Sequence, residues 1–141
     1  MSRLRPNFQP DFRDRQAGTL PDLLGIVVDR LADGVIDLSM VVERRHLAPN
    51  GYLHAASVVA LADTAAGYGC VAHLPDGASG FTTIELKSNF VGTALEGRIA
   101  ARATLVHGGR STQLWDATVT APDGRTIALF RCTQMVLWPR P

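Results

Sequence analysis

The chain of 141 residues contains only two cysteines, Cys70 and Cys132, and each stands among apolar neighbours. Two cysteines so far apart form no disulfide framework, and a metal cluster needs more Cys or His at close spacing. We therefore expect two buried, reduced thiols and no metal site.

An excess of charge of one sign is also missing, because 14 Lys and Arg face 13 Asp and Glu. This balance gives no electrostatic support for nucleic-acid binding, which needs a clustered basic surface. The first twenty residues lack the apolar core of a signal peptide, and no run approaches the ~18 consecutive apolar residues of a membrane span. We expect a soluble, cytoplasmic protein.

The length fits one domain. Residues 1–20 lack periodicity and predict an irregular arm, and the periodic segments lie in residues 21–141. Two β-branched runs in residues 26–42 flank Ala32-Asp33-Gly34 and predict a hairpin. Residues 54–71 are apolar and uninterrupted by proline, and their length favours a helix. Four strand-like segments follow, which we interpret as a meander: 81–91, 97–107, 111–121 and 125–138.

One helix among runs of strands indicates an α+β fold with an antiparallel sheet. The predicted helix is rich in alanine and glycine, and such small side chains let a sheet approach closely and curl around it. This order of elements resembles the hotdog fold, an antiparallel sheet wrapped around one long central helix.

Asp63 is a carboxylate in the middle of this apolar helix. Its neighbours one turn away, Val59, Ala60, Ala66 and Gly67, carry no polar group. Partial desolvation raises the pKa of a carboxyl group and suits it to act as a base or nucleophile. A solvated position or a local cap is the alternative interpretation.

The start of the helix is the second candidate. The first backbone N–H groups of a helix have no internal partners, and a well-placed donor stabilises an oxyanion by roughly 3–4 kcal/mol. Small residues at Ala55 and Ala56 keep these groups accessible. His54 either takes part in the chemistry or holds the loop before the helix.

Ala55 and Asp63 are eight residues apart, and one helix separates them by about 12 Å. A single carbonyl group cannot engage both groups of the same helix. Either only one of them is functional, or Asp63 comes from a second subunit of a two-fold dimer. The second case predicts an obligate oligomer.

The segment from Asn50-Gly51 through His54-Ala55-Ala56 to Asp63 resembles the G-x-x-H-G-G-x(6)-D signature of hotdog-fold acyl-CoA thioesterases of the PaaI-like group, within the phenylacetic acid degradation and 4-hydroxybenzoyl-CoA thioesterase superfamily. The resemblance continues through Thr82-Thr83, Asn89-Phe90, Gly97 and residues 106–110. It covers roughly residues 25–137.

The resemblance implies hydrolysis of an aryl- or short- to medium-chain acyl-CoA in a homodimer or homotetramer, without metal or other cofactor. It implies that Asp63 activates water or attacks the carbonyl, and that the Ala55 N–H polarises the thioester oxygen. It assigns His54 to the loop or the leaving group, and Thr83, or else Thr82, to a hydroxyl from the partner subunit that places the water. Asn50, Gly51 and Ala56 match substrate-binding positions.

Two departures from the family's pattern stand out. Ala55-Ala56 replaces Gly-Gly, so the N–H remains but a methyl group narrows the approach. Ala48 occupies a position at which many relatives carry Asn or Gln, and Asn50 lies near it but out of register.

His107-Gly108-Gly109-Arg110 lies between two predicted strands. Its glycine-rich backbone and one arginine suit a nest for a phosphate of CoA, with Gly109 and Arg110 as the contacts, or else form a plain hairpin turn. Lys87 and Arg102 are weaker candidates for phosphate binding, and solvated strand positions explain them better.

Two other functions stay open beside thioester hydrolysis. A hotdog hydratase or dehydratase would pair an acid with a catalytic histidine, which only a dimer could bring together here. A dimeric acyl-CoA binding module without turnover is favoured by the two alanines that replace glycine.

Overall fold

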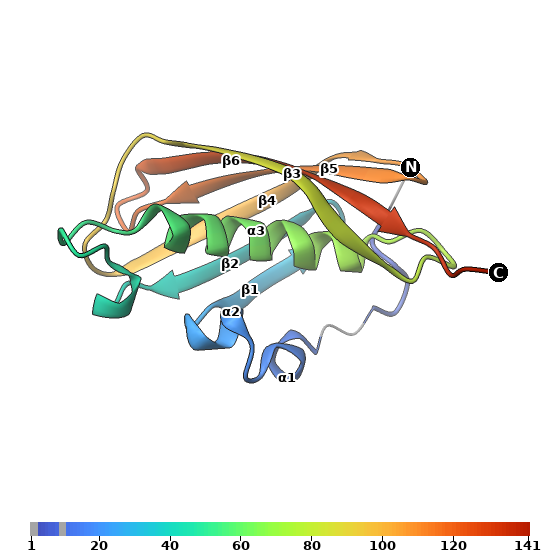
Figure 1. Cartoon of the computed structure of the whole chain (residues 1–141), viewed down its shortest axis with the longest axis horizontal. Coiled ribbons are helices and arrows are strands. Elements are labelled where there is room, and N and C mark those ends of the chain that lie inside the picture. Colours follow the sequence, from blue (N-terminus) through green and yellow to red (C-terminus); the bar gives the residue numbers. More distant parts are fainter. Residues whose placement is uncertain (1–2, 9–10) are drawn as a thin grey trace.

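A six-stranded antiparallel sheet curves around one long helix in the computed structural model of the chain (Figure 1). The structure describes residues 3–8 and 11–141. The sheet has the strand order β1-β2-β4-β5-β6-β3. The helices are α1 Phe12–Gln16, α2 Leu20–Leu23, the 3₁₀ helix η1 Arg44–His46 and α3 Ala55–Ala72. The strands are β1 Val27–Ala32, β2 Val35–Val41, β3 Gly80–Phe90, β4 Arg98–Gly108, β5 Thr112–Thr120 and β6 Thr126–Leu137.

This architecture confirms the predicted α+β hotdog fold, including the hairpin of β1 and β2 and the extent of the long helix. The predicted four-strand meander is wrong in one strand, because β3 pairs with β6 and β4 pairs with β2. Periodicity identifies strands but not their neighbours. Residues 91–97 form a longer connection than the tight turns that join β4 to β5 and β5 to β6, and they carry the chain across to the other side of the sheet.

Glycines on α3 bring the sheet against the helix. A Cβ added at Gly69 would lie 2.7 Å from the ring of Trp115, and one at Gly67 would lie 3.1 Å from the ring of Phe81. Both rings therefore occupy space that a side chain on the helix would fill. By length and composition α3 could span a membrane, but 56% of it is buried under the sheet, which is the position of a core helix.

The N-terminal segment departs from the predicted irregular arm, because Phe12–Gln16 form α1. Phe12 stacks on Tyr68 of α3 with 4.4 Å between ring centroids, and the Tyr68 hydroxyl donates to Gln16 Oε1 at 2.7 Å. Five residues make little more than one helical turn, which is too short for a periodic signal. The arm prediction at residues 1–2 and 9–10 lies outside the described residues, and the domain boundary at residue 20 stays a prediction.

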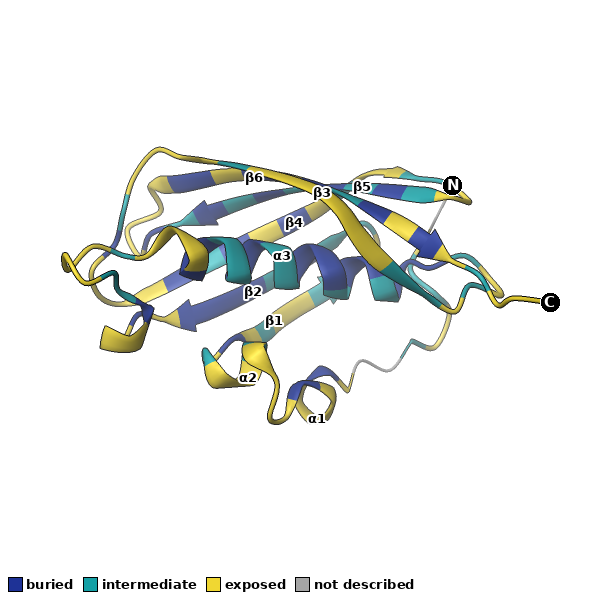
Figure 2. Cartoon of the chain, viewed as in Figure 1, coloured by how far each residue is buried: buried dark blue, intermediate teal, exposed yellow. Residues whose placement is uncertain are grey.

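The two edges of the sheet differ. Figure 2 shows α1 and α2 beside β1, whereas β3 is exposed along most of its length. Ile84, Leu86 and Phe90 of β3 are exposed apolar side chains. An uncovered edge strand offers unpaired backbone groups to another chain.

Candidate functional site

The loop that leads into α3 is held by its own backbone. Leu47 and Leu53 form an isolated antiparallel bridge, and Gly51 turns the chain with a φ of +88°. The Asn50 side chain accepts a hydrogen bond from the Tyr52 N–H at 3.2 Å, so its oxygen is used within the turn. The side-chain oxygen of Asn50 is thus engaged in a local hydrogen bond. The predicted contact between Asn50 and the substrate stays a prediction.

The first backbone N–H groups of α3 differ in their hydrogen-bond partners. The Ala56 N–H donates to His54 Nδ1 at 2.9 Å, and the Ser57 N–H donates to the His54 carbonyl at 3.0 Å. Ala55 is an exposed residue, and its N–H has no hydrogen-bond acceptor among the described residues. One donor at the positive end of the helix is therefore free to meet a ligand oxygen.

His54 is the N-cap of α3, and its cap fixes its tautomer. Because Nδ1 accepts the Ala56 N–H, a neutral His54 carries its proton on Nε2. The side chain is exposed. Because His54 is the N-cap, its Nε2–H belongs to the same end of the helix as the Ala55 N–H. The cap shows how His54 holds the loop before α3, and its part in the chemistry stays a prediction.

Asp63 lies two turns further along α3 and is partly exposed. Its Oδ1 is buried and has no hydrogen-bond partner among the described residues. Burial raises the pKa of the Asp63 carboxyl above its ordinary value, as the apolar neighbours predict. A partly exposed carboxylate without a hydrogen-bond partner is suited to accept a hydrogen bond, and then the proton, from a water molecule.

A row of polar side chains on β3 and β6 consists of Thr83, Gln134 and Cys132. Burial, and after it the charge of Asp63, raises the pKa of the Cys132 thiol to about 12. Gln134 is fully buried, donates to Cys132 Sγ at 3.4 Å and accepts the Thr83 hydroxyl at 2.7 Å. Since the Thr83 hydroxyl donates its hydrogen bond to Gln134 Oε1, its oxygen is left to accept a hydrogen bond from another group.

Gln134 is missing from the sequence-based candidates. Glutamine at an inward position of a strand is the signal that could have identified it, since a buried amide needs partners.

Cys70 and Cys132 are both buried, as predicted, and burial is the main cause that raises the pKa of each thiol to about 12. Neither thiol is a nucleophile at neutral pH.

The remaining predicted residues lie on the strands and in the β4–β5 turn. Gly109 and Arg110 form the turn between β4 and β5, near the C-terminal end of α3, beside Trp138. Arg102 makes a two-pronged ion pair with Asp37, and Lys87 lies in a shallow depression on the strands with Arg131. These two are solvated strand positions, as the sequence favoured. Thr82 is exposed opposite Met135 of β6.

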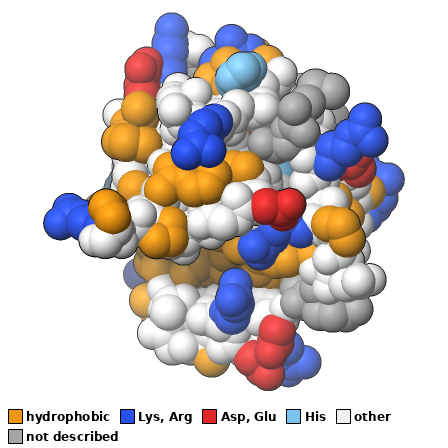
Figure 3. Space-filling model, turned by 90° about the vertical axis from the view of Figure 1, so that its right-hand side faces the viewer, with side chains coloured by type: hydrophobic (Ala, Val, Ile, Leu, Met, Phe, Trp, Pro, Cys, Tyr) orange, Lys and Arg blue, Asp and Glu red, His pale blue; other side chains and the backbone are white. Residues whose placement is uncertain are grey.

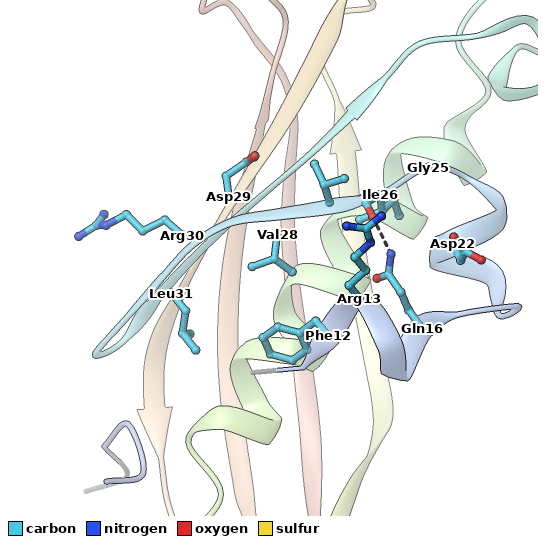
Figure 4. Close-up of a pocket in the computed structure, with 11 residues that line it drawn as sticks. Phe12, Arg13, Gln16, Asp22, Gly25, Ile26, Val28, Asp29, Arg30 and Leu31 are labelled. Atoms are coloured by element: carbon cyan, nitrogen blue, oxygen red, sulfur yellow. Dashed lines mark hydrogen bonds between the residues drawn. The ribbon is translucent and has the colours of Figure 1, made fainter. Parts of the chain in front are cut away.

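A cavity of about 700 Å³ between α1, α2 and β1 contains none of the predicted site residues. Figure 4 shows it beside β1, with Phe12, Val28 and Leu31 on its apolar side and Arg13 and Gln16 near Ile26. The edge of β1 is the opposite edge of the sheet from β3. Because none of the predicted site residues lines this cavity, we take the start of α3 together with Asp63 as the candidate site.

Residues 50–128 match the family model of the thioesterase superfamily, which is more than half of the chain. The chain belongs to the thioesterase superfamily. A 1,4-dihydroxy-2-naphthoyl-CoA hydrolase of Listeria monocytogenes is 28% identical to this chain over 114 residues. The match covers 81% of this chain and 92% of that protein. Homologues named as thioester hydrolases make this chain an enzyme of that class.

Solved structures agree with this assignment. A mutant of the thioesterase PA1618 from Pseudomonas aeruginosa superimposes with a TM-score of 0.87 at 28% identity, covering 93% of this chain and 96% of that one. The thioesterase SAV0944 from Staphylococcus aureus reaches a TM-score of 0.80 at 28% identity, covering 83% and 97%. SAV0944 has been solved with a glutamine replaced by alanine, and also with a glutamate fifteen positions later replaced by alanine.

The raised pKa of Asp63 predicts how Asp63→Asn changes stability with pH. The folded chain holds this proton more tightly than the unfolded chain, so the carboxylate destabilises the fold above the unfolded pKa of about 3.9. Asp63→Asn should raise the melting temperature at pH 7, and this gain should disappear near pH 3, where both states are protonated. Thermal melts at the two pH values measure it, with Glu96→Gln as an exposed control. A lower melting temperature for Asp63→Asn at pH 7 would contradict the burial of an unpartnered carboxylate.

Proposed function

We propose that the chain hydrolyses acyl-CoA thioesters with aryl or short- to medium-chain acyl groups to the free acid and CoA. The observation that carries the proposal is the free Ala55 N–H at the start of α3, on the same helix as the unpartnered carboxylate of Asp63. The first group suits a developing oxyanion and the second suits a base or a nucleophile.

The Ala55 N–H binds the thioester oxygen, and the Nε2–H of His54 adds a second donor beside it. Asp63 either takes a proton from water, whose oxygen then bonds to the carbonyl carbon, or attacks that carbon itself. The carbon–sulfur bond breaks, and the thiolate of CoA leaves and takes up a proton. In the second route water then hydrolyses the acyl–Asp63 anhydride. The Thr83 oxygen accepts a hydrogen bond from the water and orients it, because the Thr83 hydroxyl donates its own hydrogen bond to Gln134 Oε1.

The two halves of the site come from different subunits. About 12 Å of helix separates Ala55 from Asp63 in one chain, too far for one carbonyl group. The exposed edge of β3 offers a place for a second copy, because pairing would cover its apolar side chains. A two-fold dimer formed there builds two equal sites. We propose an obligate homodimer in the cytoplasm, and a homotetramer made of two such dimers.

The same geometry disfavours a hydratase or dehydratase. Such a reaction needs a histidine with a free basic nitrogen facing the substrate. In His54 the cap on α3 occupies Nδ1, and Nε2 carries the proton. Hydrolysis at this site needs no metal and no cofactor besides the CoA thioester that is its substrate. Gly109 and Arg110 are the proposed contacts to the phosphates of CoA.

Asp63→Asn tests the proposed function most simply. It removes the base and nucleophile but keeps the shape of the side chain, so thiol release from a panel of acyl-CoA substrates should fall by at least about a hundredfold. Thiol detection on the intact oligomer measures the rate. Full turnover by the variant would exclude Asp63 as the reacting carboxylate, and no turnover by the unchanged chain on any substrate would favour a binding module.

Ala55→Pro removes the proposed oxyanion donor alone. Proline fits the first position of a helix, and His54 before it has the extended conformation (φ −67°, ψ 132°) that proline requires. We expect kcat to fall about 100- to 1,000-fold with little loss of stability. Ala55→Gly, which keeps the N–H, is the matched control and should retain or increase activity. Equal kcat for the two variants would show that this N–H does not bind the oxyanion.

Ala48 and Asp63 are fifteen positions apart, the same spacing as the glutamine and glutamate replaced in SAV0944. Ala48 begins the loop before α3, with its N–H donating to the Tyr52 carbonyl at 2.7 Å. An amide at this position would add a polar group near the start of the helix. We expect Ala48→Gln to raise kcat/KM several-fold, corresponding to about one neutral hydrogen bond. Ala48→Leu, of similar bulk, serves as the control, and an equal increase in both would attribute the gain to packing.

A further inference from the structure

A polar cavity lies at the other end of α3 from Ala55 and includes the proposed CoA contacts Gly109 and Arg110, so an assignment of its ligand to CoA rests on the proposed function. Its volume is about 560 Å³, and the N-terminal segment, the β4–β5 turn and Trp138 line it. Arg3, Arg5 and Arg110 contribute three guanidinium groups, against one carboxylate from Asp76. Figure 3 views the molecule from the side of the chain termini and shows Lys and Arg side chains over apolar surface there.

These arginines differ from those on the strands. Arg102, Arg131 and Arg125 are paired with Asp37, Asp116 and Asp123. Arg3, Arg5 and Arg110 form no ion pair with the part of the chain that the structure describes. Positive charges gathered around one cavity repel each other unless an anion joins them.

Two of the three guanidinium groups are held in place. The Arg110 guanidinium lies 4.3 Å from the ring centroid of Trp138, whose indole N–H donates to the Arg110 carbonyl at 3.1 Å. The Arg5 guanidinium lies 5.0 Å from the Phe8 ring, and Arg5 Nε is buried without a hydrogen-bond partner among the described residues. A buried charged donor without an acceptor is costly, and a bound anion would remove this cost.

Backbone bonds hold the N-terminal segment against this end of the helix. The Arg5 N–H donates to the Ala72 carbonyl at 3.0 Å, and the Leu4 N–H donates to Asp33 Oδ1 at 2.8 Å. Gln113 already binds the His73 carbonyl at 2.8 Å. Since backbone and amide donors satisfy these carbonyls at the end of α3, the guanidinium groups are not needed to cap the helix.

We propose that this cavity is a binding site for phosphate groups, in particular a diphosphate, with Arg5 and Arg110 as its main contacts and Arg3 at its rim. Arginine presents two parallel N–H groups that match phosphate oxygens, and a diphosphate can bridge two arginines from different segments. The phosphates belong either to the CoA half of the substrate or to a separate small molecule. From Asp63 the site lies about 14 Å along α3, at the level of Ala72.

Titration with inorganic pyrophosphate tests the site without any catalytic step. Calorimetry on the full chain should show binding that weakens at least about tenfold in Arg5→Gln and in Arg110→Gln, and that weakens with added salt. Arg15→Gln removes the same charge from α1 and should bind like the unchanged chain. Absence of pyrophosphate binding, or equal binding by all three variants, would overturn the proposal.

A purely structural role of Arg5 gives a different result. It would lower the melting temperature of Arg5→Gln by the same amount with and without pyrophosphate. A binding role makes pyrophosphate raise the melting temperature of the unchanged chain and of Arg15→Gln, but not of Arg5→Gln.

Kinetics with two substrates identify the source of the phosphate. One carries its acyl group on CoA, and the other carries it on pantetheine, which lacks the diphosphate. If CoA occupies the site, Arg5→Gln raises KM for the acyl-CoA alone, about tenfold, at unchanged kcat. If KM is unchanged for both substrates while pyrophosphate binding is lost, the ligand is a separate phosphate compound.

Discussion

The close contact between α3 and the sheet is the constraint on which the rest of the structure depends. Gly69 admits the ring of Trp115 and Gly67 admits that of Phe81, so the sheet follows the helix along its length. Trp115 is fully buried and its indole N–H donates to Gln113 at 2.8 Å, a residue paired with Gln134 in the sheet. A helix held this tightly behaves as a rigid rod, and its two ends and Asp63 keep fixed positions.

The rigid helix holds the two candidate groups, the Ala55 N–H and the Asp63 carboxylate, at fixed positions and keeps them apart. At the start of α3 the cap by His54 satisfies the next two N–H groups and leaves that of Ala55 free. Two turns later the same helix carries a carboxylate whose pKa is raised by burial. Because about 12 Å of one helix separates these groups, we propose that a complete site needs two helices, with the exposed β3 edge as the surface where a second chain pairs.

Local patterns in the sequence predicted much of this arrangement. The apolar run after Asn50-Gly51 located α3, and the neutral surroundings of Asp63 predicted its raised pKa. The place of β3 beside β6 depends on contacts between distant segments, which periodicity does not contain. For the same reason the sequence did not show that Gln134 joins Thr83 to Cys132, or that Phe12 packs on Tyr68.

Mixing two inactive variants tests most directly whether each site takes Ala55 from one subunit and Asp63 from the other. Chains with Asp63→Ala and chains with Ala55→Pro are each expected to be nearly inactive alone. In a mixed dimer one site combines the intact Ala55 of the first chain with the intact Asp63 of the second. Random exchange makes about half of the dimers mixed, each with one working site of two, so about a quarter of the normal activity should return. No recovery of activity in dimers shown to have mixed would contradict a site built from two subunits.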